Sequence, residues 1–192
     1  MTVTAAVVPA AGAARRFGGG KLTTSLEDGR PLLEHTLESL LEAGLRHVVV
    51  VAADADAFAE VAAIRDPRVT LVVNPEPDRG MFASIRCGLD ALATAPDVLV
   101  VLPGDMPFVR AAVIASLVAE ASRGRAVVPR FAGRRGHPLV LPGRFVDPLR
   151  HQPDTTTLKL AMGTLGVTPE EIDVDDPGVL RDVDRPEDLS AS

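Results

Sequence analysis

The chain has few aromatic side chains. Tryptophan and tyrosine are absent and phenylalanine occurs six times among 192 residues, although 46% of the residues are hydrophobic. The core must therefore be built from alanine, valine and leucine, and such small side chains suit helices packed closely on a sheet. A chain of this length can bury one sizeable core, so we expect a single domain over residues 1–192.

Cysteine, an excess of basic residues and long apolar runs are also missing. The single Cys87 excludes an intramolecular disulfide and a multi-cysteine zinc site. A net charge of −6 argues against nucleic acid as a partner. No run of about 18 apolar residues predicts a membrane span, and the first residues do not resemble a signal peptide. We expect a cytoplasmic protein without a membrane partner, and the sequence leaves open whether it is a monomer or a homodimer.

Strand and helix patterns alternate along the first two thirds of the chain. Short β-branched runs predict buried strands, and apolar residues three or four positions apart predict helices. The expected strands are 3–8, 47–53, 69–73 and 97–102, and the expected helices are 31–43, 58–64, 82–93 and 109–121. This alternation predicts right-handed crossovers in one mainly parallel sheet, and hence an α/β three-layer sandwich.

The pattern changes after Gly124. Residues 125–131 and 138–141 predict two strands, with residues 133–136 as the tip of a hairpin between them. A helix over 157–165, a short strand over 172–174 and a helical turn over 186–189 are expected to follow. The hairpin would add antiparallel strands, so we expect a mixed but mostly parallel sheet.

A glycine-rich loop, PAAGAARRFGGGK, occupies residues 9–21 directly after the first expected strand. Its small residues let the backbone approach a ligand, and Arg16 and Lys21 add positive charge, so the loop suits a triphosphate. It is not a P-loop, because Lys21 is followed by Leu22, and it contains no G-x-G-x-x-G. A solvated glycine-rich turn is the alternative interpretation.

Carboxylates in two other segments could hold a metal ion. Asp105, in LPGDMP, follows the strand expected over 97–102, at the edge where open α/β sheets bind ligands. A lone carboxylate there suits Mg²⁺ held against phosphate oxygens. Asp182 and Asp184 alternate in DVDRPEDL, so extended backbone would aim both to one face, and either could be a second ligand. The alternatives are a helix cap for Asp105 and a solvated acidic tail for the pair.

Two further segments could contact ligands. Residues 74–89 run from Asn74 through a turn at Gly80 into a helix that carries Ser84, and the N-terminus of this helix could meet an anion or a base edge. Arg134 and His137, in RRGHP, could bind the phosphate of an acceptor. Ordinary turn and surface roles are the alternatives for both segments.

The order of these motifs resembles that of the MobA-like NTP transferases. The motifs are A-A-G-x-x-x-R-x-G-x-x-K, N-P-x-x-x-x-G-M-x-x-S, P-G-D-M-P, G-H-P and D-x-D-x-P-E-D-L. Within that family the chain looks most like the MocA-type molybdenum cofactor cytidylyltransferases, and it is more distantly similar to 4-diphosphocytidyl-2-C-methyl-D-erythritol synthases. The resemblance implies a Rossmann-like nucleotide-diphospho-sugar transferase fold. It also implies Mg²⁺-dependent transfer of a nucleoside monophosphate from an NTP to a small phosphorylated acceptor, with molybdenum cofactor as one candidate.

The resemblance also implies roles for residues at matching positions. The expected catalytic residues are Arg16, Lys21 and Asp105. The expected nucleotide-binding residues are Ala10, Ala11, Gly12, Asn74, Gly80 and Ser84. Mg²⁺ would be held by Asp105 and Asp184, with Asp182 as the alternative to Asp184. Arg134 and His137 would bind the acceptor.

The chain departs from the family pattern in three places. Ala14 and Phe17 stand where the family usually has serine and methionine, and residues 151–157 (HQPDTTT) replace the G-D-x-G-A-R stretch of MocA-type acceptor binding. Ala-Ala-Gly at residues 10–12, in place of Ala-Gly-Gly, favours CTP over GTP. A non-catalytic nucleotide-binding protein and a metal-dependent glycosyltransferase are the competing hypotheses. Arg16, Lys21, Asp105 and Asp184 together argue against the first, because a pure binder does not need both carboxylates. Lys21 argues against the second, because a lysine in this loop is better explained by a triphosphate.

Overall fold

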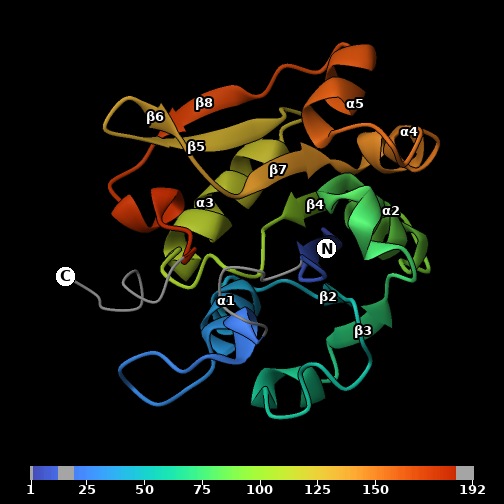
Figure 1. Cartoon of the computed structure of the whole chain (residues 1–192). Coiled ribbons are helices and arrows are strands. Elements are labelled where there is room, and N and C mark those ends of the chain that lie inside the picture. The colour runs from blue at the N-terminus through green and yellow to red at the C-terminus, as the bar shows by residue number, and fades with distance from the viewer. Residues whose placement is uncertain (1, 13–19, 185–192) are drawn as a thin grey trace.

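The computed structural model describes residues 2–12 and 20–184, which form one eight-stranded mixed sheet with helices on both faces (Figure 1). The strands are β1 (Thr4–Pro9), β2 (His47–Ala52), β3 (Val69–Val73), β4 (Val98–Val101), β5 (Val127–Phe131), β6 (Arg134–Arg135), β7 (Leu139–Pro142) and β8 (Glu170–Asp173). They are ordered β3-β2-β1-β4-β7-β5-β6, and β8 pairs with β5. Strands β3, β2, β1 and β4 are mutually parallel, whereas β7 is antiparallel to both β4 and β5. The predicted mixed, mostly parallel sheet is confirmed.

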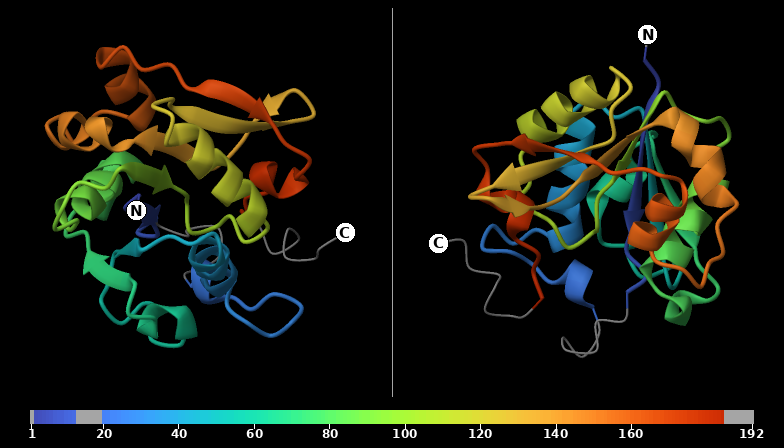
Figure 2. Two further views of the ribbon diagram at one scale, coloured as in Figure 1. Left: turned by 180° about the vertical axis from the view of Figure 1, so that it is seen from behind. Right: turned by 90° about the horizontal axis from the view of Figure 1, so that it is seen from above.

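Five α-helices cover the two faces of the sheet. They are α1 (Leu32–Glu42), α2 (Met81–Asp90), α3 (Ala111–Ala121), α4 (Val146–Arg150) and α5 (Leu158–Thr164). Successive strand residues point to opposite faces, so Ala6 and Val8 pack in one core with α1 and α3, while Ala5 and Val7 pack in the other with α2, α4 and α5. The two views of Figure 2 show these helix layers on either side of the sheet. The three-layer α/β sandwich is therefore as predicted.

Two local predictions were wrong. Residues 58–64 do not form a helix; turns lead instead into a short 3₁₀ helix, η3 (Ala62–Arg65). Asp54 Oδ1 accepts a hydrogen bond from Asp56 N at 2.9 Å, and such local bonds compete with helix formation. The hairpin tip is not residues 133–136, because Arg134–Arg135 form β6 and the chain reverses at Ala132 and Gly133. Both reversal residues have positive φ, 48° and 77°, as two-residue hairpins require.

Other local features were not foreseen or are not described. Helix α4 and four further 3₁₀ helices, η2 (Lys21–Thr23), η4 (Pro77–Arg79), η5 (Gly143–Phe145) and η6 (Pro177–Leu180), were not predicted. The helical turn expected over 186–189 lies outside the described residues.

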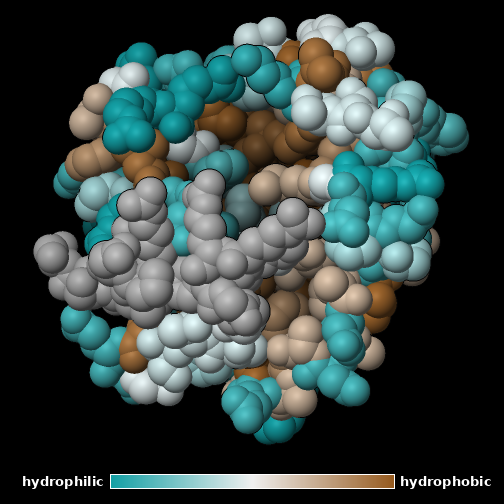
Figure 3. All heavy atoms as spheres, in the orientation of Figure 1, coloured by the Kyte–Doolittle hydropathy of each residue, from teal (hydrophilic) through white to brown (hydrophobic). Residues whose placement is uncertain are grey.

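Among the helices of the described ranges, none is long and apolar enough to cross a membrane. In Figure 3, hydrophilic residues predominate around the rim of one face, and hydrophobic residues lie in a recess near its upper centre.

Candidate active site

A cavity of about 810 Å³ opens at the carboxyl ends of the parallel strands. Its lining comes from the segments that follow β1, β2 and β4, from the start of α2 and from the 3₁₀ helix η2 (Lys21–Thr23). These residues include Pro9, Ala10, Gly12, Lys21, Asp54, Phe58, Gly80, Met81, Ser84, Pro103, Asp105 and Asp184. Open α/β sheets bind their ligands at this edge, so the predicted position of the site agrees with the geometry.

Lys21 joins the two carboxylates that the sequence singled out. Its Nζ donates to Asp105 Oδ2 and to Asp184 Oδ1, each at 2.8 Å. The Lys21 side chain is 12% exposed, against 26% for Asp105 and 51% for Asp184. Asp105 lies 84 positions after Lys21 in the sequence, and Asp184 lies 163 positions after it. The fold thus brings two distant carboxylates to one ammonium group in the cavity.

The charge of Lys21 is stabilised by these contacts. Burial alone would lower the pKa of its ammonium group, but the hydrogen bonds and charges of Asp105 and Asp184 more than offset this, and the pKa lies above its ordinary value. Lys21 therefore stays positively charged at neutral pH.

A second cavity of about 270 Å³ adjoins the first and shares Met81, Pro103 and Asp105 with it. Its other lining residues come from the segment after β4, from β6 and the following turn, and from the η6 region. They are Met106, Arg134, Arg135, Gly136, His137, Val179, Leu180 and Asp182. The predicted acceptor residues thus lie together beside the larger cavity.

Charges in the second cavity influence one another. Loss of solvation lowers the pKa of His137 below its ordinary value, and the negative charges of Asp105 and Asp182 partly oppose this shift. The pKa of Asp182 is raised by burial and by the negative charges of Asp184 and Asp105. Arg135 is paired with Glu171 at 3.4 Å, whereas within the described residues the Arg134 guanidinium makes no hydrogen bond or ion pair.

The predicted nucleotide-binding residues differ in their positions. Ala10, Gly12, Gly80 and Ser84 line the larger cavity, and Ala11 is buried beside it. Asn74 does not line it.

Asn74 instead holds the turn behind the cavity wall. Its Nδ2 donates to Ser84 Oγ at 3.0 Å, and its Oδ1 accepts from Glu76 N at 2.9 Å. Its side chain therefore orients Ser84 and shapes the turn. The direct contact between Asn74 and the nucleotide stays a prediction. Arg16, the remaining predicted catalytic residue, lies outside the described residues.

Sequence reasoning missed one wall of the larger cavity. Ala53, Asp54, Ala57 and Phe58 follow β2 and line the cavity. Only the topology of the sheet could have predicted their position, because the segment after any parallel strand of this sheet reaches the same edge. The residues themselves, small or apolar apart from Asp54, carry no motif.

Residues 6–165 match the model of the MobA-like NTP transferase domain. The chain belongs to this family. It is therefore a nucleotidyltransferase, as the sequence motifs predicted, and the lysine and carboxylates at the carboxyl edge of its sheet agree with that chemistry. The matched range does not include Asp184, which lies beyond its last residue.

Individual relatives of this MobA-like NTP transferase differ in activity. The chain is 30% identical over 184 residues to the 2-C-methyl-D-erythritol 4-phosphate cytidylyltransferase of Streptomyces avermitilis, which covers 90% of this chain and 70% of that protein. It is 32% identical over 143 residues to the nicotine blue oxidoreductase of Paenarthrobacter nicotinovorans, covering 70% and 69%. The crystal structure of Rv0371c from Mycobacterium tuberculosis H37Rv is similar with a TM-score of 0.79 and 25% identity, covering 98% of this chain and 96% of that one.

Proposed function

We propose that this MobA-like NTP transferase moves the nucleoside monophosphate of an NTP, with CTP preferred, onto a small phosphorylated acceptor and releases pyrophosphate. The observation that carries the proposal is the position of Lys21 Nζ, 2.8 Å from both Asp105 and Asp184 in a cavity large enough for a nucleotide. The preference for CTP is supported by the Ala-Ala-Gly sequence at residues 10–12 and by the cytidylyltransferase relative.

The donor set fits Mg²⁺. One oxygen each from Asp105 and Asp184 already lies 2.8 Å from a shared cation, the Lys21 ammonium group. Within residues 2–12 and 20–184, no cluster of three or more histidine, cysteine or acidic side chains suits a metal. Two carboxylates are sufficient for an ion that keeps water and phosphate oxygens as its other ligands. Asp105 and Asp184 would hold Mg²⁺, which would neutralise charge on the triphosphate. A manganese complex of Rv0371c has been solved on the same fold.

Lys21 and Arg16 would bind the triphosphate. An oxygen of the acceptor phosphate attacks the α-phosphorus, the new P–O bond forms, and the bond from the α-phosphorus to the bridging oxygen of pyrophosphate breaks. The attacking oxygen is already anionic, so neither a general base nor a covalent enzyme intermediate is required. Positioning and charge neutralisation by the lysine and the glycine-rich backbone can carry the rate.

The smaller cavity would take the acceptor. Arg134, Arg135 and His137 offer donors for an anionic group, and Met106, Val179 and Leu180 offer an apolar side for the rest of the molecule. Molybdenum cofactor is one candidate acceptor. The proposed compartment is the cytoplasm, with the protein as a monomer or a homodimer.

The test is pyrophosphate release with each of the four NTPs and Mg²⁺ against a panel of phosphorylated acceptors that includes molybdenum cofactor and methylerythritol phosphate. We expect turnover with CTP, and its loss by about 10²-fold or more in Asp105→Asn and Asp184→Asn. Asp182→Asn is the matched control and should retain more activity than Asp184→Asn. Failure of every NTP and acceptor pair would favour a non-catalytic nucleotide-binding protein or an activity like that of the oxidoreductase relative.

A further inference from the structure

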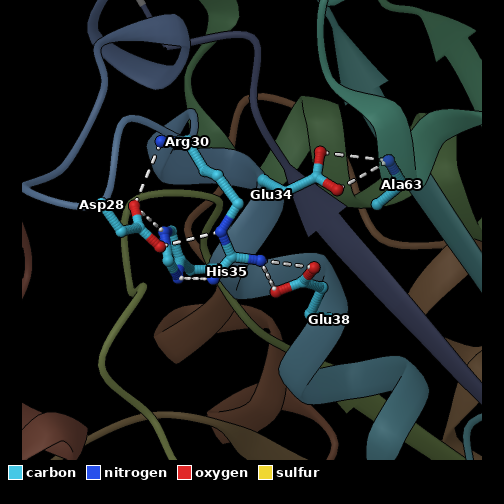
Figure 4. Close-up of polar contacts among 6 residues, drawn as sticks. All are labelled: Asp28, Arg30, Glu34, His35, Glu38 and Ala63. Carbon is cyan, nitrogen blue, oxygen red and sulfur yellow. Dashed lines mark hydrogen bonds and ion pairs between the residues drawn. The ribbon is translucent and has the colours of Figure 1, made fainter.

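Glu34 is a buried carboxylate that the proposed reaction does not use. It lies in the first turn of α1 and is 6% exposed. Its Oε1 and Oε2 both accept from Ala63 N, at 3.0 and 3.1 Å (Figure 4). A charged side chain is rarely buried unless hydrogen bonds stabilise it, so this contact requires an explanation beyond helix packing.

The contact fastens a segment that has few other polar attachments. Among the described residues, only the hydrogen bond from Ala63 N to Glu34 joins residues 53–65 to a distant part of the chain. The other bonds of the segment are local, such as Val61 N to Phe58 O at 3.0 Å. Apart from apolar packing, Glu34 is therefore what holds this segment against α1.

The fastened segment forms a wall of the larger cavity. Ala53, Asp54, Ala57 and Phe58 all line that cavity, and Phe58 is only 5% exposed. Glu34 does not line it. The carboxylate thus lies behind the wall, and a shift of the backbone at Ala63 would be passed to Phe58 through the short turns between them.

We propose that Glu34 is a positioning residue, which fixes the wall over residues 53–58 and thereby sets the affinity of the cavity for its nucleotide. The inference rests on the proposed function in that the ligand of this cavity is taken to be an NTP. Binding sites gain affinity when their walls are already ordered before the ligand arrives, because less ordering must accompany binding. Freeing the wall should therefore weaken nucleotide binding more than it slows the chemical step.

A neighbouring carboxylate on the same helix supplies the control. Glu38 accepts from Arg30 Nη1 through both oxygens, at 2.7 and 2.6 Å, and Arg30 also donates to Asp28 (Figure 4). This network is partly exposed, and among the described residues none of its hydrogen bonds or ion pairs reaches residues 53–65. Glu38→Gln therefore removes a carboxylate from the same helix without removing the hydrogen bond to Ala63.

The experiment compares full-length wild type, Glu34→Leu, Glu34→Gln and Glu38→Gln by calorimetric titration with CTP and by amide hydrogen exchange of residues 53–65. In Glu34→Leu we expect a Kd for CTP about tenfold higher and faster exchange in the segment, with kcat changed less than KM. Glu34→Gln keeps one acceptor oxygen and should bind CTP within about threefold of wild type, as should Glu38→Gln. Should Glu34→Leu fail to fold, Glu34→Asp replaces it, because the shorter side chain withdraws the carboxylate and keeps its charge.

Two results would overturn the inference. One is a Glu34→Leu or Glu34→Asp protein that binds CTP like wild type, with or without faster exchange. The other is a Glu34→Gln protein as weak as the leucine variant, because the retained acceptor would then have no effect. A wild-type protein that binds none of the four NTPs overturns the proposed function instead, and the exchange measurement still decides whether Glu34 holds the segment.

Discussion

At the scale of single residues, the ammonium group of Lys21 can pair either with two carboxylates or with oxygens of a triphosphate. In the described structure its ammonium group lies between Asp105 and Asp184. These contacts keep it charged and hold the loop end at the cavity. When a nucleotide binds, phosphate oxygens offer the same ammonium group an equally strong set of acceptors. Under the proposed function, Lys21 would move a short distance from the carboxylates to the nucleotide.

Lys21→Ala should lower kcat by about 10²-fold or more, because a preorganised positive charge is lost where negative charge develops. Steady-state pyrophosphate release measures the effect. Lys159, which is exposed on α5 and lines neither cavity, supplies the control Lys159→Ala, expected to behave as wild type. Near-normal turnover in Lys21→Ala would contradict the proposed mechanism.

Arg134→Gln should raise KM for the acceptor by about tenfold to 150-fold and leave KM for CTP unchanged, because a charged donor worth about 1.5–3 kcal/mol is removed from the smaller cavity alone. Initial rates with each substrate varied in turn separate the two constants. Arg123→Gln, on an exposed arginine paired with Glu120, is the control. An equal rise in both KM values would show that the arginine does not act on the acceptor specifically.

At the scale of elements, α2 is packed unusually closely on β1. A Cβ at Gly88 would lie 2.5 Å from Val7 Cγ1 and 3.0 Å from Val51 Cγ2. Both valines are fully buried, so neither can move aside without disturbing the core. The start of α2 carries Gly80, Met81 and Ser84 into the cavity, so this close approach also positions that part of the site.

Gly88→Ala should destabilise the protein by about 1–3 kcal/mol through overpacking. Gly163→Ala on α5 is the comparison variant, because a Cβ added there meets no atom within 4 Å. That substitution should stabilise by about 0.4–1 kcal/mol, because alanine restricts the unfolded chain. Urea unfolding midpoints compare the two variants, and equal effects of the same sign would refute the packing argument.

Asp66→Asn should remove a pH-dependent contribution to stability at the start of β3. The side-chain hydrogen bond from Arg68, followed by the backbone N–H of Arg68, lowers the pKa of Asp66 to about 2. A folded pKa below the unfolded value of about 3.9 stabilises the protein at higher pH, and this stabilisation disappears as the pH falls from about 4 through about 2.

The wild type should therefore be more stable than Asp66→Asn at pH 6, and the difference should shrink below pH 4. Urea titrations at pH 6, 4 and 3 measure it. Asp175→Asn, on an exposed carboxylate without a partner in the described residues, should show no such trend. If the difference in stability between the wild type and Asp66→Asn grew as the pH fell, the result would contradict this prediction.

At the scale of the whole molecule, the parallel half of the sheet could be predicted more fully than the rest. Each parallel strand is a short β-branched run, and topology then fixes the edge at which Lys21 and Asp105 meet. The ion pairs of Lys21 with two carboxylates could not be predicted, because they depend on side-chain positions across three segments. Nor could the wall at Phe58, whose residues carry no motif and whose backbone forms turns where helical spacing predicted a helix.

Binding of CTP should raise the Tm of the whole protein, since the proposed ligand contacts segments that follow β1, β2 and β4. At a concentration 100 times Kd the stabilisation is about 2.7 kcal/mol. Thermal scans with each NTP and Mg²⁺ measure the shift, and we expect CTP to exceed GTP. Adenosine without phosphates serves as the control. A Tm unchanged by all four NTPs would contradict the assignment of the cavity.

Strand β7 has a consequence for how the chain is made in the cell. The four parallel strands exist once residue 101 has been synthesised, but the outer edge of β4 is covered only by residues 139–142. An uncovered strand edge is a template for pairing with other chains. A ribosome that stalls between these points therefore exposes an edge prone to aggregation. Substitutions that delay folding of the β5–β7 region should reduce the yield of soluble protein before they reduce its specific activity.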